Sequence, residues 1–63
     1  MKLWIARERT NILYLYRDKP VRLQYGFLPS TSFFFKMADN SLFPEVTFEN
    51  SPQQVEIKLI KNE

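Results

Sequence analysis

Hydrophobic residues in this chain recur mostly at every second position, or in short runs that are apolar on both sides. A period of two is that of a β-strand, in which successive side chains point to opposite faces of a sheet. No helical period extends far enough to compete. Five or six short strands at intervals of about 8–12 residues predict one all-β domain over residues 1–63, a small antiparallel meander that is strongly curved or barrel-like. The expected strands are Lys2–Arg7, Ile12–Arg17, Val21–Phe27, Ser32–Met37, Glu45–Glu49 and Val55–Leu59.

The stretch Phe33-Phe34-Phe35, within Ser32–Met37, is apolar on both faces of its expected strand. Such two-sided hydrophobicity is typical of a central strand with apolar neighbours above and below the sheet. A chain of 63 residues can cover one face of a sheet with its own side chains but rarely both. We therefore expect the second face to be closed by curling of the sheet, by a second copy of the chain, or by a ligand.

The first two expected strands, Lys2–Arg7 and Ile12–Arg17, also carry apolar side chains on both faces. Their spacing predicts a hairpin. Because the hairpin turn contains no glycine, Asn11 is the best candidate for a left-handed backbone conformation. Trp4 shares its face with a lysine, which predicts a half-buried indole ring.

The clearest alternation of apolar and polar residues lies at the end of the chain, in Glu45–Glu49 and Val55–Leu59. The intervening Asn50–Gln53 is rich in turn-forming residues, so the two segments are expected to pair as a hairpin. Just before this hairpin, a short helical turn over Ser41–Phe43 is an open alternative to a loop. The side chains expected to point inward from the hairpin are Val46, Phe48, Val55, Ile57 and Leu59.

The segment Val21–Phe27 alternates as well and predicts one half-exposed strand or an extended segment along a sheet edge. It contains Gly26, the single glycine of the chain. A glycine inside a strand pattern indicates a bulge or a close approach of another group to the backbone.

The composition excludes several kinds of chemistry. The chain has no cysteine and no histidine, so it lacks disulfides, thiolate metal sites and the commonest general base. Glu45 and Glu49 lie on one face of their expected strand, about 13 Å apart. A glycosidase pair needs about 5–9.5 Å between its carboxyl groups. We therefore expect no enzyme activity, no metal and no cofactor.

The net charge of +2 is unevenly distributed, with a balance of +4 in residues 1–31 and −2 in residues 32–63. Such asymmetry can attract a polyanion to the basic half or favour antiparallel self-association, and it also fits a mixed solvated surface. The opening residues lack the apolar run of a targeting segment, and no stretch is long enough to span a membrane. We expect a cytoplasmic protein with no membrane partner.

Several stretches resemble a group of small uncharacterised β-rich proteins from gut-dwelling anaerobic bacteria and their phages or mobile elements. The first turn of those proteins is typically rich in Asp and Gly, whereas Arg7–Asn11 stands there in this chain. The resemblance implies a bacterial or phage setting and no particular activity. The stretches are Met1–Arg7, Leu13–Tyr16, Lys19-Pro20, Leu42–Pro52 and Val55–Leu59.

Aromatic residues form the best candidate for a binding surface. If Phe34 shares a face with Tyr14 and Tyr16, that face becomes an aromatic platform; otherwise these rings simply fill the core. Because Tyr, Trp and Arg contribute most to protein interfaces, the leading hypothesis is a non-catalytic interaction module that binds a protein partner or a second copy of itself. The alternative is binding of single-stranded nucleic acid, which combines stacking rings with basic side chains. The candidate binding residues under both hypotheses are Trp4, Tyr14, Tyr16, Arg17, Arg22 and Phe34.

Overall fold

A computed structural model describes residues 1–58 of the chain, and all regular structure within them is β. This confirms the predicted all-β class. The segment Ser41–Phe43 lies in a turn rather than in a helix. The strands are β1 (Lys2–Arg7), β2 (Leu13–Tyr16), β3 (Val21–Arg22), β4 (Phe27–Leu28), β5 (Phe34–Lys36) and β6 (Gln53–Glu56).

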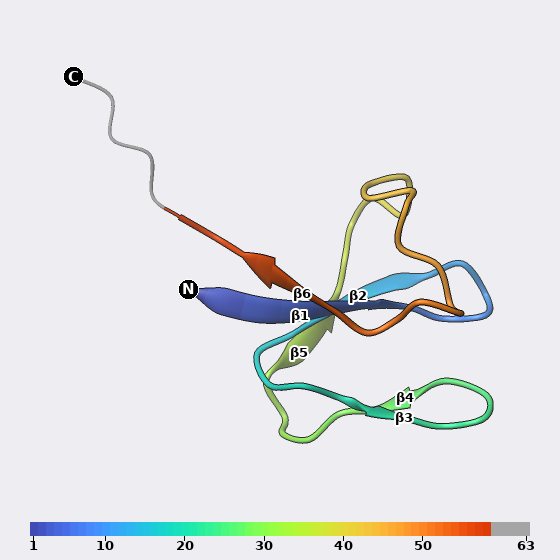
Figure 1. The fold of residues 1–63 in the computed structure, drawn as a ribbon, viewed down its shortest axis with the longest axis horizontal. Coiled ribbons are helices and arrows are strands. Elements are labelled where there is room, and N and C mark those ends of the chain that lie inside the picture. The colour runs from blue at the N-terminus through green and yellow to red at the C-terminus, as the bar shows by residue number, and fades with distance from the viewer. Residues whose placement is uncertain (59–63) are drawn as a thin grey trace.

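The strands form two separate antiparallel sheets. Four of them make one sheet in the order β5-β2-β1-β6, and β3 pairs only with β4 (Figure 1). The predicted barrel-like closure is not supported, because the larger sheet is open, with β5 and β6 as its edges. A closed barrel needs every strand to pair on both sides. Here the edge strands have only three and four residues. The two strands that could have joined these edges, β3 and β4, pair with each other in the smaller sheet.

The hairpin of β1 and β2 is formed as predicted. Trp4 lies opposite Tyr16 and Arg7 opposite Leu13, and beyond the strands the Glu8 amide donates to the Ile12 carbonyl at 2.8 Å. Asn11 has a φ of 72°, which confirms the predicted left-handed residue of the turn. This hairpin supplies the two central strands of the sheet.

The predicted C-terminal hairpin is wrong. The segment Glu45–Glu49 forms turns, and β6 pairs instead with β1, where Val55 lies opposite Leu3. The reason is local: the Asn50 side chain accepts from the Thr47 amide at 2.8 Å and donates to the Glu45 carbonyl at 2.9 Å. Such side-chain bonds satisfy backbone groups that a strand would have used. Leu59, the last predicted inward residue, lies outside the described part of the chain.

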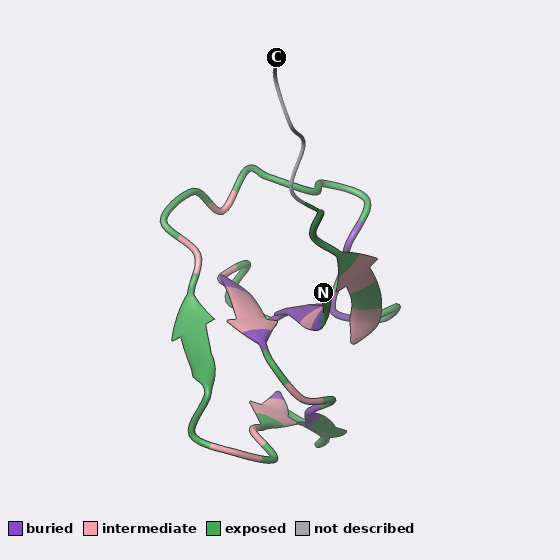
Figure 2. Ribbon diagram, turned by 90° about the vertical axis from the view of Figure 1, so that its left-hand side faces the viewer, coloured by how far each residue is buried: buried purple, intermediate pink, exposed green. Residues whose placement is uncertain are grey.

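The predicted central position of Ser32–Met37 is also wrong. Residues Phe34–Lys36 form β5, an edge strand that pairs on one side with β2. The side chains of Phe33, Phe34 and Phe35 are 58%, 40% and 61% exposed. In Figure 2 the ribbon of β5 is coloured as exposed along its length, whereas β1 is mostly buried. An apolar run on both faces therefore marks an uncovered edge here rather than a buried centre.

The segment Val21–Phe27 is not one strand. It bends back between β3 and β4, and the Leu23 amide donates to the Gly26 carbonyl at 2.7 Å across the turn. Gly26 is buried, and a methyl group on its Cα would lie 2.6 Å from Oε1 of Glu8. The predicted close approach at Gly26 is therefore confirmed, and the approaching group is a glutamate from the first turn.

The larger sheet lies between two covering segments (Figure 1). On one face Ile5 and Leu13 are almost completely buried and pack with Val46, which belongs to the long connection between β5 and β6. On the opposite face the β3–β4 hairpin lies against the first turn and β2, as the contact between Gly26 and Glu8 shows. The chain thus closes part of its second face with its own hairpin.

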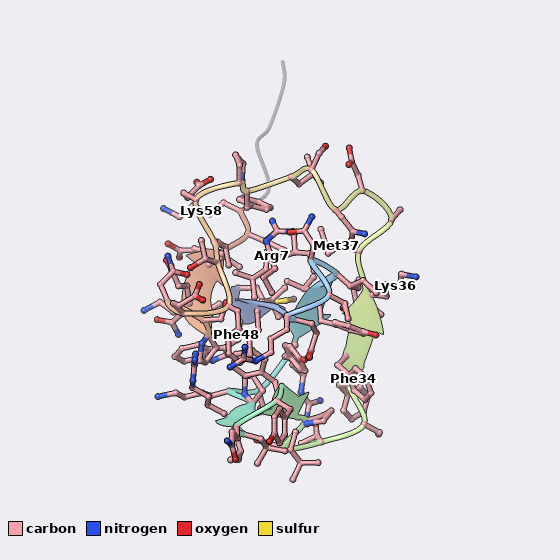
Figure 3. All side chains as sticks on the ribbon, turned by 90° about the vertical axis from the view of Figure 1, so that its right-hand side faces the viewer. Arg7, Phe34, Lys36, Met37, Phe48 and Lys58 are labelled. Atoms are coloured by element: carbon pink, nitrogen blue, oxygen red, sulfur yellow. The ribbon has the colours of Figure 1, made fainter. Side chains whose placement is uncertain are left out.

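Arg7 fixes the connection between β5 and β6. Its side chain is buried and donates five hydrogen bonds of 2.6–3.1 Å to backbone carbonyl groups, while its amide donates to Oγ of Ser51. Neither ion pair found among residues 1–58 includes Arg7. Figure 3 shows Arg7 below this connection. The accepting carbonyls belong to Asn11, Asn40, Leu42, Phe43 and Val46.

Candidate functional site: the aromatic face and the β5 edge

The register of the sheet places Trp4, Tyr14, Tyr16 and Phe34 on one face. Tyr16 lies opposite both Trp4 in β1 and Phe34 in β5, and Tyr14 is two residues away on the same strand. The ring centroids of Tyr16 and Phe34 are 5.8 Å apart in a stacked arrangement, and Tyr14 is 6.3 Å from Tyr16 and 6.4 Å from Phe34. The condition that the sequence left open, a face shared by Phe34 and the two tyrosines, is therefore met.

These rings differ in how far a partner could reach them. Tyr16 is only 3% exposed, whereas Trp4 and Tyr14 are half-buried and Phe34 is exposed. The half-burial of Trp4 agrees with the sequence prediction. The ammonium group of Lys19 lies 5.3 Å from the Trp4 ring and covers part of it. The accessible part of this face is consequently its β5 side.

The two candidate arginines lie away from the aromatic cluster. Arg17 is on the opposite face of the sheet, where its guanidinium lies 4.0 Å from the Phe33 ring centroid and its Nε donates to Asp18. The hydrogen bond from Arg17 lowers the pKa of Asp18 below its usual value, with a further contribution from Thr31.

Arg22 joins β3 to the connection before β6. Its guanidinium lies 4.4 Å from the Phe48 ring centroid and donates to the backbone carbonyls of Phe48 and Ser51. On the other side, Phe27 of β4 contacts Phe48 edge to face, with ring centroids 5.8 Å apart. Arg22 thus has a structural task and does not border Tyr14 and Phe34.

Burial gives Tyr16 an unusual titration. Desolvation raises the pKa of its phenol to about 12, with smaller contributions from the negative charge of Glu8 and from Tyr14. The Glu8 carboxylate is therefore close enough to the aromatic cluster for its charge to affect the Tyr16 phenol.

The first testable prediction concerns alkaline pH. Because the folded-state pKa of Tyr16 is raised above its ordinary value of 10.0, the stability that its neutral phenol contributes is full below pH 10 and is lost as the pH rises through about 12. Phenolate absorbance should show a step near pH 12 while the protein remains folded. The step should disappear in Tyr16→Phe, and a titration identical in the two proteins would contradict the burial of this phenol.

The β5 edge is the feature that sequence reasoning missed. Three phenylalanines in a row are exposed there, and Figure 3 shows Phe34 and Lys36 projecting at the outer margin of the sheet. Lysine is a typical residue of exposed edge strands, so Lys36 was the available signal. The length of the apolar run nevertheless favoured the prediction of a central strand.

A pocket of about 360 Å³ opens where β2 and β5 meet the β3–β4 hairpin. We call it the β2–β4 pocket. The residues that line it are Glu8, Thr10, Ile12, Tyr14, Tyr16, Phe27, Pro29 and Phe34.

A second pocket of similar volume lies beside Arg7, under the connection between β5 and β6. The guanidinium at its wall already donates five hydrogen bonds to backbone carbonyls, so its role there is structural. Across residues 1–58, acidic side chains nowhere gather in the groups of three that would suit a metal ion. The same part of the chain contains no apolar helix of membrane-spanning length.

The comparisons with known proteins identify no relative. Neither a family model, nor a curated protein, nor a solved structure matches this chain. The sequence and the geometry described above are therefore the basis for any functional assignment.

Proposed function

We propose that this protein is a non-catalytic interaction module that self-associates, with the β5 edge of one copy pairing with the β5 edge of a second copy. The observation that carries the proposal is the row of exposed side chains Phe33, Phe34 and Phe35 on an edge strand. Exposed apolar edges are the places where sheets add strands from other chains. We therefore expect the partner to bind at the margin of the aromatic face rather than at its buried centre.

The backbone of β5 supports a strand partner. In an antiparallel ladder, alternate residues direct their N–H and C=O groups to the neighbouring strand. Phe33 accepts from the Arg17 amide and Met37 donates to the Leu13 carbonyl, so the odd-numbered residues face β2. The N–H and C=O groups of Phe34 and Lys36 therefore point away from the sheet, toward the position of an added strand.

Two copies of β5 are complementary to each other. If a two-fold axis passes beside Phe35, each Phe34 pairs with the partner's Lys36 through the free backbone groups, and the two Phe35 residues face each other. Phe34 then meets a lysine, which can lie on its ring, and Phe35 meets an aromatic ring. No like charges lie opposite each other in this register. Because the contact rests on a short strand, we expect a weak dimer, with a Kd in the micromolar range or above.

The second prediction tests this proposal with Phe35→Glu. The change places two carboxylates directly opposite each other and removes a ring pair, so self-association should weaken at least about tenfold. Because Phe35 is 61% exposed, the monomer should keep its fold. The measurement is absolute mass by light scattering behind a sizing column, over micromolar to millimolar protein concentrations and at two salt levels.

The matched control is Tyr25→Glu, since Tyr25 is 76% exposed in the turn between β3 and β4 and lies outside β5. It should associate like the unmodified protein. A protein that is monomeric at every concentration, or an equal effect of both substitutions, would overturn the proposal.

Binding of single-stranded nucleic acid is the second candidate, supported by the exposed ring of Phe34, the half-buried ring of Tyr14 beside it and Lys36 on the same face. It is less well supported, because Arg17 and Arg22 do not border these rings. Titration of an oligonucleotide, followed by Trp4 fluorescence, would favour it if binding fell steeply with salt. The cytoplasmic and bacterial or phage setting stays a prediction.

A further inference from the structure

The β2–β4 pocket has the size of a small-molecule site and lies on the opposite face from Phe35. Its volume of about 360 Å³ falls within the range of about 300–1,000 Å³ typical of ligand pockets. Its lining combines four aromatic residues, two apolar residues, one threonine hydroxyl group and one carboxylate. The pocket shares Phe34 with the proposed β5 contact, but its other lining residues lie outside β5.

The carboxylate belongs to Glu8, which is held in place by the backbone around it. Its amide donates to the Ile12 carbonyl at 2.8 Å and its carbonyl accepts from the Asn11 amide at 2.9 Å. The carboxylate lies against Gly26, where the missing side chain leaves room for it. This explains why Gly occupies that position although its φ does not require one.

Glu8 is half-buried, and the described part of the chain gives it no ion-pair partner. Among residues 1–58, no side chain forms an ion pair with it and no N–H or O–H group donates to its carboxylate. The Glu8 carboxylate oxygens remain accessible to solvent at the pocket, so a ligand can reach them. The pocket therefore offers a negative charge that a bound cation would neutralise.

The aromatic walls favour the same kind of ligand. Tyr14, Phe27 and Phe34 line the pocket, and ring faces attract cations. Phe27 already has the Arg22 guanidinium 5.7 Å from its ring centroid, which leaves Tyr14 and Phe34 for a ligand. Among the described residues, Glu8 is the one carboxylate in the lining, whereas a metal site in a protein usually combines several acidic or carbonyl ligands, and an anion would meet the charge of Glu8. An organic cation with an apolar surface fits both the rings and the carboxylate.

We propose that the β2–β4 pocket binds a small organic cation of the alkylammonium class, with Glu8 as its counter-ion and the rings of Tyr14 and Phe34 as its apolar walls. The raised pKa of Tyr16 supports the proposal, since the charge of Glu8 contributes to it.

The third prediction uses choline as the probe and 3,3-dimethylbutan-1-ol, its uncharged carbon analogue, as the comparison. Titration followed by NMR shifts of the aromatic rings should show choline binding in the millimolar range and the alcohol at least about tenfold more weakly. Equal binding of the two compounds, or binding of neither, would overturn the proposal.

The variant Glu8→Gln keeps the shape of the side chain and removes its charge, so choline should bind at least about tenfold more weakly. The matched control is Glu49→Gln, an exposed residue outside the pocket, which should bind choline like the unmodified protein. If Glu8→Gln does not fold, Gly26→Ala provides a second variant, because its methyl group displaces the carboxylate. Unchanged choline binding by a folded Glu8 or Gly26 variant would contradict the role of Glu8, whatever the mass of the protein.

Discussion

Replacing Arg7 by methionine is expected to remove a large part of the free energy of unfolding. The change removes all five side-chain hydrogen bonds to the carbonyls around the β5–β6 connection, with little change in side-chain volume. Hydrogen bonds to a charged group contribute about 1.5–3 kcal/mol each, but the carbonyls near the surface regain water, so we expect a net loss of about 3 kcal/mol or more. A domain of 63 residues has a free energy of unfolding of only about 3–9 kcal/mol.

Urea unfolding measures this loss, and Arg17→Met is the matched control. Arg17 has a half-exposed side chain, one ion pair with Asp18 and a contact with the exposed Phe33 ring, so its replacement should change the free energy of unfolding by less than about 1 kcal/mol. Arg7→Lys should be intermediate, since an ammonium group has three donors and cannot reach carbonyls on several sides at once. Equal stability of the two methionine variants would show that Arg7 does not hold the connection.

Leu13→Ala has the second largest expected effect, a loss of about 2–5 kcal/mol. Leu13 has no exposed surface and packs with Ile5 and Val46, which join the sheet to the connection above it. Removing its side chain leaves a cavity between two layers that a chain of this size cannot easily collapse. Leu23→Ala, at a position 47% exposed, should cost less than about 1 kcal/mol in the same urea experiment. Similar losses in both variants would place the core elsewhere.

The two-residue period was sufficient to predict the central hairpin and the composition of its faces. β1 and β2 are joined by a short turn, and the length of that turn fixes how their residues pair. The grouping of Tyr14, Tyr16 and Phe34 follows from the same parity once β5 pairs with β2. These features depend on residues that are close together in the sequence, so the sequence alone is enough to predict them.

The remaining features depend on competition between distant segments. The alternation of Glu45–Glu49 was sufficient for a strand, but the side chain of Asn50 folds it into turns and leaves β6 to pair with β1. The sequence could not weigh these local hydrogen bonds against a strand ladder. Arg7 was predicted where the first strand meets its turn and was given no structural role, although its parity with Leu3 and Ile5 indicated the buried face.

The β5 edge shows why hydrophobicity alone misleads in a small domain. Two-sided apolar strands are central in large sheets, where other elements cover both faces. This chain has one covering segment for each face, and both leave β5 exposed. The phenylalanines that were expected in the core are therefore exposed, and a second copy of the chain can contact them.

The most direct test of self-association through β5 is disulfide trapping with Phe35→Cys. The chain has no cysteine, so the new thiol is the only one. In the proposed register the two residues 35 face each other as a non-hydrogen-bonded pair with about 4.5 Å between their Cα atoms, which is within disulfide range. Under mild oxidation we expect this variant to form a covalent dimer much faster than Tyr25→Cys, whose position is more exposed but outside β5. Cross-linking of both variants at the same rate would contradict the proposal.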